Sequence, residues 1–310
     1  MKKLFVIALA TAALASCSKV EPIEPGHKSA IGFSKSFVEN STKALITTAN
    51  IANFSVWGTE NGASIFNGVE VRKDDDTQGS TWGYTGTRYW HENSAYKFAA
   101  IAPFAHGLTN IVLTNQLPTT ATYTLVDGGT DSQIDLLYDA AADVNVTTDL
   151  PTTAVAFNFE HMLAKVQFSF TNGHIAACGY KVQISELKIA AFSSATVTFA
   201  SKTWTAPTPT TPLALTFPIN DDDPIAENTT VNSRESLIIP AAADTYTITG
   251  KAEIIYNSNV VKTINFNQTL PALQAGYHYD IKATITSDKP IVFSATVNDT
   301  WGDGADTTLN

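Results

Sequence analysis

Few residues of this 310-residue chain have a type and spacing that could do chemistry. His91 and Glu92 begin like the zinc-binding sequence HExxH, but the second histidine, four positions on, is absent. His161 lies between a carboxylate and an apolar run in FNFEHMLAKV, with no nucleophile near it that it could serve as a general base. We therefore interpret it as a core or edge histidine. No GxSxG, P-loop or CxxC motif occurs either, so we predict a protein that is not an enzyme and holds no cofactor.

Acidic side chains are in excess, and they too form no recognisable site. The net charge is −10 and no cluster of Lys and Arg is present, whereas binding to nucleic acid phosphates needs clustered cations. The carboxylates at 74–76 and 221–223 lack the spaced ligand pattern of a calcium loop, and NDTWGDGAD (298–306), with three carboxylates among glycines, is a slightly better calcium candidate. We interpret them as solvated turns, and we predict no metal site and no nucleic acid partner.

Cys17 is the residue whose surroundings do fit a known reaction. Residues 1–16 open with a basic start, continue as an apolar run too short to span a bilayer and end in small residues, which is typical of a secretory signal peptide. With Cys17, the sequence Leu-Ala-Ser-Cys resembles a bacterial lipobox, in which a peptidase cuts before the cysteine and the thiol carries diacylglycerol. The alternative is an ordinary signal peptide in which Cys17 is incidental.

A lipid on Cys17 has two consequences for the rest of the chain. Residues 17–29 contain two X-Pro steps, so we expect an extended tether between the lipid anchor and the folded part. Cys178 in HIAACGYK then has no partner for an internal disulfide, and we expect it to be a small buried apolar residue.

The remainder of the sequence has the two-residue period of β-strands. Apolar and polar side chains alternate in KVQFSF (165–170), YTITGKAEIIY (246–256) and YHYDIKATI (277–285), and TINFNQT and IVFSATV add two more runs. Such alternation is typical of antiparallel strands with one buried face and one solvated face. Turn clusters separate the runs, and no convincing amphipathic helix is apparent. We predict an all-β fold built from antiparallel β-sandwiches.

The length of the chain predicts two such sandwiches in series. Removing residues 1–16 leaves 310 − 16 = 294 residues, which suffices for two domains at roughly 150 residues each. Segment 143–153 is polar, contains proline and has no strong strand pattern. We therefore predict an N-terminal sandwich over 30–153 and a C-terminal sandwich over 154–310.

Four aromatic residues gather in the Gly- and Thr-rich sequence TWGYTGTRYW: Trp82, Tyr84, Tyr89 and Trp90. Displayed on a loop, such rings stack on the faces of sugars, and rings next to Arg88 form cation–π contacts. The alternative is that these rings fill the core of a sandwich.

Short segments in a fixed order give this chain a resemblance to a known family. They are TKA (42–44), NFSVWGT (53–59), YWHENSAYKFAAIAP (89–103), DLLYDAA (135–141), FNFEHMLAKVQFSF (157–170), SLIIP (236–240), LQAGYHYDI (273–281) and a late Trp-Gly (301–302). Following a lipobox, this series resembles the fimbrillin family of Bacteroidales, the lipoprotein pilin precursors of type V pili.

The resemblance implies two transthyretin-like β-sandwich domains and a structural or adhesive subunit of a cell-surface fimbria. It also implies that the precursor is lipid-anchored in the outer membrane and that an Arg- or Lys-specific protease removes its first strand. The exposed groove then accepts a donor strand from the next subunit, with main-chain hydrogen bonds giving affinity and side-chain pockets giving register. The expected partners are other fimbrial subunits and the outer membrane.

The sequence FVENSTKALITT contains the expected processing site. It follows AIGFSKSF, which has the pattern of a first strand with Ile31 and Phe33 on one face. Asn-Ser-Thr is polar enough to enter a protease cleft, and Lys43 supplies the basic side chain that such a protease recognises. We predict cleavage between Lys43 and Ala44. The alternative is that Lys43 is a loop lysine and the precursor stays whole.

The sequence TWGDGADTTLN bears on the position of the subunit in the fimbria. IVFSATVND is needed as a strand of the second sandwich. The residues after it have no apolar alternation, and their Gly and Asp residues disfavour a strand. Stem subunits of this family, in contrast, carry a donor strand at this position. We therefore predict a tip or accessory subunit rather than a stem subunit. The alternative function is a monomeric surface lipoprotein that binds glycan or a host surface protein through its aromatic loop.

Overall fold

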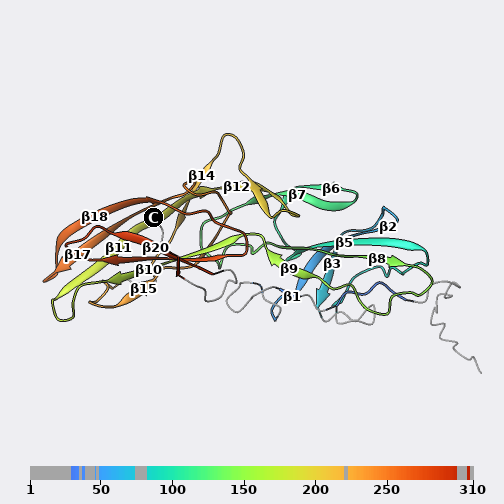
Figure 1. Ribbon diagram of the computed structural model, residues 1–310, viewed down its shortest axis with the longest axis horizontal. Helices are drawn as coiled ribbons and strands as arrows, with labels where there is room; N and C mark the ends of the chain where they lie inside the picture. The colour runs from blue at the N-terminus through green and yellow to red at the C-terminus, as the bar shows by residue number, and fades with distance from the viewer. Residues whose placement is uncertain are drawn as a thin grey trace, which may run out of the picture.

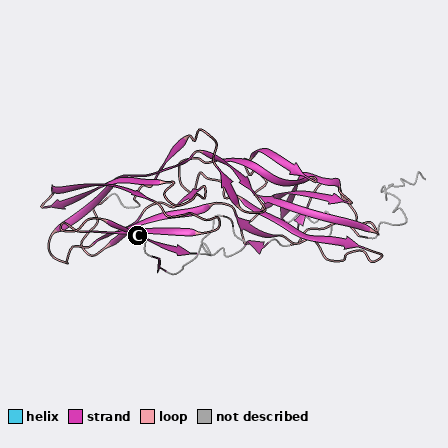
Figure 2. Ribbon diagram, turned by 45° about the horizontal axis from the view of Figure 1, so that its top comes forward, coloured by secondary structure: helices cyan, strands magenta, loops and turns pink. Residues whose placement is uncertain are grey.

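The computed structural model describes residues 29–34, 37–38, 46, 49–73, 82–219, 223–298 and 306–307. Every regular element in these ranges is a β-strand, so the predicted all-β class is confirmed. The molecule is elongated, and its sheets follow one another along the long axis (Figures 1 and 2). None of the described residues forms a helix long and apolar enough to cross a membrane.

The first sheet lies at the right of Figure 1, with its described strands in the order β1-β9-β8-β5-β2-β3-β4. The bounds are β1 (Phe37–Val38), β2 (Asn53–Glu60), β3 (Ala63–Lys73), β4 (Trp82–Gly83), β5 (Ser94–Ala102), β8 (Leu137–Val146) and β9 (Asn158–His161). Neighbouring strands are antiparallel, except for β1 and β9, which are parallel.

One face of this sheet is covered by a cluster of buried side chains, which we call the N-terminal core. It contains Ile31, Phe33, Ile51, Phe54, Val56, Phe66, Val71, Trp82, Tyr84, Trp90, Tyr96, Phe98, Ala100, Ala102, Leu137, Val146, Val155, Phe157 and Phe159. Aromatic and β-branched side chains favour strands because they pack well on a pleated, half-buried surface. The many rings bury a large apolar area, which is the main source of stability at this end of the molecule.

Two further sheets face each other at the opposite end. One has the order β15-β10-β19-β20-β21 with β16 paired to β10, and the other has the order β14-β11-β17-β18. The bounds are β10 (Ala164–Asn172), β11 (Tyr180–Phe192), β14 (Pro212–Thr216), β15 (Thr230–Asn232), β16 (Ser236–Ile238), β17 (Thr247–Tyr256), β18 (Asn259–Thr269), β19 (His278–Ile285), β20 (Val292–Asn298) and β21 (Asp306–Thr307). Strands β10 and β19 are parallel, which the prediction of antiparallel sheets did not include.

The predicted alternation decides which side chains meet between these two sheets. Val166, Phe168 and Phe170 of β10 are fully buried. They share a cluster with Ile281 of β19 and with side chains of β11 and β17. The alternation in 246–256 places Tyr246, Ile248, Ala252, Ile254 and Tyr256 on one face, expected to be buried. Strand β17 departs from this at its end, where Tyr256 is 39% exposed.

A smaller sheet with the order β13-β12-β7-β6 joins the two ends of the molecule. The bounds are β6 (Thr109–Thr114), β7 (Leu117–Thr124), β12 (Ser194–Thr198) and β13 (Thr203–Thr205). Strands β6 and β7 belong to the first half of the chain and β12 and β13 to the second, and residues 120–124 pair with 194–198. Trp57 and Ile101 of the first sheet lie in the same buried cluster as Val197 of β12. The two ends are thus joined by main-chain pairing and by side-chain packing.

The chain passes from the first sheet to the second between β9 and β10. The strand after residue 154, expected to open the C-terminal sandwich, lies instead in the first sheet, because β9 pairs with β8. Phe157 and Phe159 accordingly belong to the N-terminal core. The two-residue period predicts which face of a strand is buried. It does not predict to which sheet or core the strand belongs, so the place of β9 could not be predicted from it.

Candidate functional site

Residues 29–34 contain most of the described part of the predicted first strand (30–37), and they lie in a slot between two other segments of the chain. They form isolated β-bridges there, at Ala30 and Phe33, and we call this segment the first strand. Segment 82–90 follows one edge and segment 151–155 the other, and rings of the N-terminal core lie beneath. We call this slot the strand seat. Ile31 and Phe33 are both fully buried in it, in agreement with their predicted common face.

Hydrogen bonds hold the first strand along the edge formed by segment 82–90. The amide of Ile31 donates to the carbonyl of Arg88 (2.8 Å), and the amide of Trp90 donates to the carbonyl of Ser29 (3.1 Å). The hydroxyl of Tyr84 donates to the carbonyl of Ile31 (2.8 Å). A side chain of the edge segment therefore reinforces the main-chain pairing.

A second set of hydrogen bonds holds the opposite edge of the first strand. The amide of Val155 donates to the carbonyl of Gly32 (2.8 Å), and the amide of Ser34 donates to the carbonyl of Val155 (2.9 Å). The hydroxyl of Ser29 donates to the carbonyl of Pro151 (2.9 Å). Because the strand is bonded on both sides, its loss would leave two rows of backbone groups without their partners.

Phe33 fills the middle of the strand seat. Its ring packs on five others, with distances between ring centroids of 6.2 Å to Phe54, 5.5 Å to Phe66, 5.6 Å to Tyr84, 6.1 Å to Phe98 and 6.0 Å to Phe157. The first four contacts are edge-to-face, the arrangement that the ring quadrupole favours, and the contact with Phe157 is stacked. Removing the Phe33 side chain would leave an apolar void lined by these rings.

The four aromatic residues singled out in the sequence lie along this edge of the seat. Trp82 is 2% exposed and Tyr84 and Trp90 are each 1% exposed, whereas Tyr89 is 42% exposed. Of the two alternatives for this segment, the arrangement favours core packing for three rings. Tyr89 is the ring of the four that a ligand could reach.

Arg88 covers the outside of the same edge. Its guanidinium carbon lies 4.4 Å from the ring centroid of Phe66 and 5.7 Å from that of Tyr84, so Arg88 does make the predicted type of cation–π contact. Burial raises the pKa of Tyr84 although Arg88 opposes the shift. The Tyr84 hydroxyl therefore remains protonated at neutral pH and continues to donate to Ile31.

A buried carboxylate–imidazole pair lies beside Ile46, shortly after the predicted processing site. Oδ1 of Asp135 is 3.0 Å from Nδ1 of His161, and the two side chains are 1% and 3% exposed. Oδ2 of Asp135 accepts a hydrogen bond of 3.2 Å from the amide of Ile46. His161 is thus a core histidine, and Asp135 ties the chain after Lys43 to the folded part.

Three of the predicted site residues, Cys17, Lys43 and Ala44, lie outside the described residues. Cys178 was expected to be buried but is only half-buried. Within the described ranges, no group of three or more His, Cys, Asp and Glu side chains is placed to hold a metal ion.

Two parts of this site have only weak signals in the sequence. Val155 and Phe157 lie within 154–310, the range predicted for the C-terminal sandwich, so the sequence does not predict the second edge of the strand seat. Asp135 carries no signal of its own, because a single aspartate before an apolar run is equally typical of a surface turn.

The fold and the strand seat together define an all-β protein whose first strand completes its N-terminal core. A model of the fimbrillin-like family matches residues 40–301. The chain therefore belongs to the fimbrillin-like family.

Two solved structures are similar to this chain along most of its length. A fimbrial protein from Bacteroides vulgatus is 16% identical with a TM-score of 0.64, and the match covers 89% of this chain and 100% of that chain. A putative cell adhesion protein from Bacteroides uniformis is 18% identical with a TM-score of 0.54, covering 88% of this chain and 98% of that chain. At these identities the similarity establishes the fold. Comparison with curated proteins gives no match.

Proposed function

We propose that this chain is a structural or adhesive fimbrial subunit that is exported as a lipoprotein and assembled by donor-strand addition. Cys17 carries the lipid that anchors the precursor in the outer membrane. Cleavage between Lys43 and Ala44 then separates the folded part from the lipid and from the first strand, and the mature subunit joins a fimbria at the cell surface. The strand seat carries this proposal, because one short segment before Lys43 completes the N-terminal core.

Loss of residues 29–34 would turn the seat into a template for another strand. It would free the carbonyl of Arg88 and the amides of Trp90 and Val155, and it would expose the rings that contact Phe33. An extended segment of another subunit satisfies such groups by main-chain hydrogen bonds, and its alternate side chains enter the vacated apolar positions. Those positions would set the register of the incoming strand.

The contact between Ile46 and Asp135 supports a cut at Lys43. Ile46 packs against the N-terminal core and donates its amide to a buried carboxylate. The chain after the cut therefore keeps its attachment to the core, while the segment before the cut is free to leave.

We further propose a tip or accessory position rather than a stem position. β20 pairs with β19, and Phe293 and Ala295 are buried, so this strand serves the C-terminal sandwich. Residues 299–310 contain Gly and Asp in place of an apolar alternation, so they would fill few pockets of a partner's groove.

The N-terminus of the mature surface form tests the proposal. We expect surface fimbriae to contain a chain that begins at Ala44, and Lys43→Ala to abolish both processing and assembly. Lys35→Ala is the matched control, because it removes a neighbouring lysine and should leave both unchanged. Assembled fimbriae that contain an intact chain beginning at the lipidated Cys17 would refute cleavage and strand exchange together.

The anchor is tested separately with Cys17→Ala. We expect an unlipidated precursor that leaves the outer membrane fraction. Tight fractionation of this variant with the outer membrane would show that Cys17 is not the lipid attachment point.

A further inference from the structure

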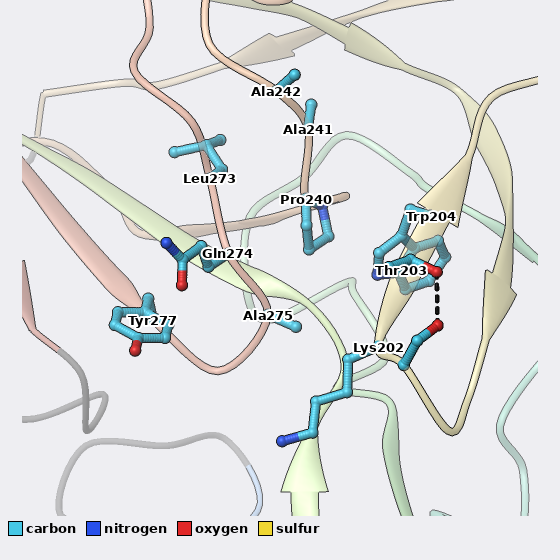
Figure 3. A pocket seen from close by; sticks show the side chains of 11 residues that line it. Lys202, Thr203, Trp204, Pro240, Ala241, Ala242, Leu273, Gln274, Ala275 and Tyr277 are labelled. Carbon is cyan, nitrogen blue, oxygen red and sulfur yellow. Dashed lines mark hydrogen bonds between the residues drawn. The ribbon is translucent and has the colours of Figure 1, made fainter.

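A pocket of about 510 Å³ lies on the C-terminal half of the chain, and none of its lining residues belongs to the strand seat. Its walls come from residues 201–204, 240–242 and 273–277. Figure 3 shows the side chains of the first stretch on one side and those of Gln274 and Tyr277 on the other. The volume falls in the range of sites that hold small ligands.

Two half-buried rings stand on opposite sides of this pocket, Trp204 and Tyr277 (Figure 3). The Trp204 ring has a fixed orientation, because its Nε1 donates to the carbonyl of Met162 (2.9 Å) and its edge packs on Tyr123. A flat ring with part of its surface in contact with solvent offers an apolar platform, and Tyr277 adds a polar hydroxyl. Such a platform suits the C–H face of a pyranose ring.

Polar groups with spare bonding capacity line the same pocket. The side chains of Gln274 and Tyr277 form no hydrogen bond with any described residue. Thr203 Oγ1 lies 2.7 Å from Ser201 Oγ (dashed line in Figure 3), and both hydroxyls keep further lone pairs. A carboxamide and several hydroxyls can donate and accept at once, which is what neighbouring sugar hydroxyls require.

The charge of the pocket favours a neutral ligand. The ammonium group of Lys202 is already paired with the carboxylate of Glu160 at 2.5 Å. The chain as a whole has a net charge of −10, so an anionic ligand would approach against its field.

The walls of the pocket are held in place before any ligand arrives. Leu273 and Ala241 exchange two main-chain hydrogen bonds, of 2.8 and 3.2 Å. The main-chain amide of Gln274 donates to the hydroxyl of Tyr279 (2.8 Å), which fixes the backbone there. A pre-formed site loses little conformational freedom on binding, which favours affinity for a small ligand.

We propose that this pocket binds a neutral saccharide, with a pyranose ring placed between Trp204 and Tyr277 and its hydroxyls bonded to Gln274 and Thr203. The proposal goes beyond the role of the chain as a fimbrial subunit and does not depend on strand exchange. It assigns saccharide binding to a site other than the aromatic segment 82–90.

Calorimetric titration of the purified, unprocessed chain with neutral oligosaccharides tests this site. The panel contains maltotriose, cellotriose, chitotriose and mannotriose, with 3′-sialyllactose as the anionic comparison. We expect saturable binding of at least one neutral member. Gln274→Ala and Tyr277→Phe should each weaken it about three- to tenfold, the loss of one hydrogen bond, while their urea unfolding midpoints stay unchanged.

Tyr89→Ala and Tyr256→Ala are the matched controls, since each removes an exposed ring elsewhere on the molecule. Neither should change saccharide affinity. The proposal is overturned if no neutral saccharide binds saturably, if only the sialylated sugar binds, or if Tyr89→Ala weakens binding while Gln274→Ala does not.

Discussion

Phe33→Ala is the most direct perturbation of the strand seat. Phe33 is fully buried and its ring packs on five other rings. Replacing a buried Phe with Ala costs about 3–5 kcal/mol, the sum of lost transfer free energy and the cavity left behind. Three of the rings around Phe33 belong to separate strands of a paired sheet: Phe54, Phe66 and Phe98. Because these rings cannot collapse freely into the cavity, we expect a value within this range for the intact precursor.

The same change should have a larger visible effect once the chain is cut. In a variant with a site-specific protease sequence in place of residues 40–43, cleavage leaves the first strand held by noncovalent contacts alone. Phe33→Ala should then weaken retention of the released peptide by a factor of roughly 10² to several 10³, which is the same free energy written as an equilibrium constant. Gel filtration of the cut protein, followed by mass spectrometry, measures how much peptide stays bound.

Phe293→Ala is the control, because Phe293 is 6% exposed and packs on Phe170 and Phe266 in the other sandwich. We expect it to lower the stability of the chain without accelerating peptide release. Two results would refute the reasoning: a loss below about 1 kcal/mol for Phe33→Ala in the precursor, or equal peptide release from the Phe33 and Phe293 variants.

Three further changes probe other positions in the fold. Asp135→Asn removes the carboxylate charge beside His161, and we expect the free energy of unfolding in urea to fall by about 1–3 kcal/mol; an unchanged midpoint would contradict a structural role for the pair. Burial lowers the pKa of His106 from 6.5, so the unfolded chain binds the proton more readily, and stability should fall as the pH drops through 6.5 towards the lower folded value. His106→Gln should reduce the dependence of the free energy of unfolding on pH in this range. If the variant keeps the same dependence, other titratable groups cause it. In Gly58→Ala the new Cβ would lie 2.7 Å from Cδ1 of Phe98. We expect the free energy of unfolding to fall by about 1–3 kcal/mol, and by less when Phe98→Leu is also present. If the effects of the two changes are strictly additive, the steric explanation is wrong.

The faces of the strands could be predicted from the sequence because a two-residue period is a local property. Val166, Phe168 and Phe170 are buried as their alternation indicates, and so are Ile31 and Phe33. Tyr256 shows where this reasoning ends, since at the end of β17 it still pairs with Tyr180 and Asn259 but its side chain is 39% exposed.

The partners of the strands could not be predicted in the same way. The parallel pairing of β10 with β19 joins segments more than a hundred residues apart, and nothing in either segment selects the other. The assignment of the run after residue 154 to the wrong core has the same cause. For the candidate site, the sequence predicted the first strand and drew attention to segment 82–90, whereas the second edge and Asp135 required the tertiary structure.

The small sheet that joins both ends of the molecule has a mechanical consequence. Residues 120–124 of β7 pair with β12, and side chains of β2 and β5 share a buried cluster with that strand. A pulling force that separates the first sheet from the C-terminal sandwich must therefore break a row of main-chain hydrogen bonds and expose apolar surface at the same time. Extension at this joint would be opposed by a cooperative barrier, in contrast to a flexible linker, which lengthens under small loads. A chain joined in this way transmits tension along its axis as a stiff segment.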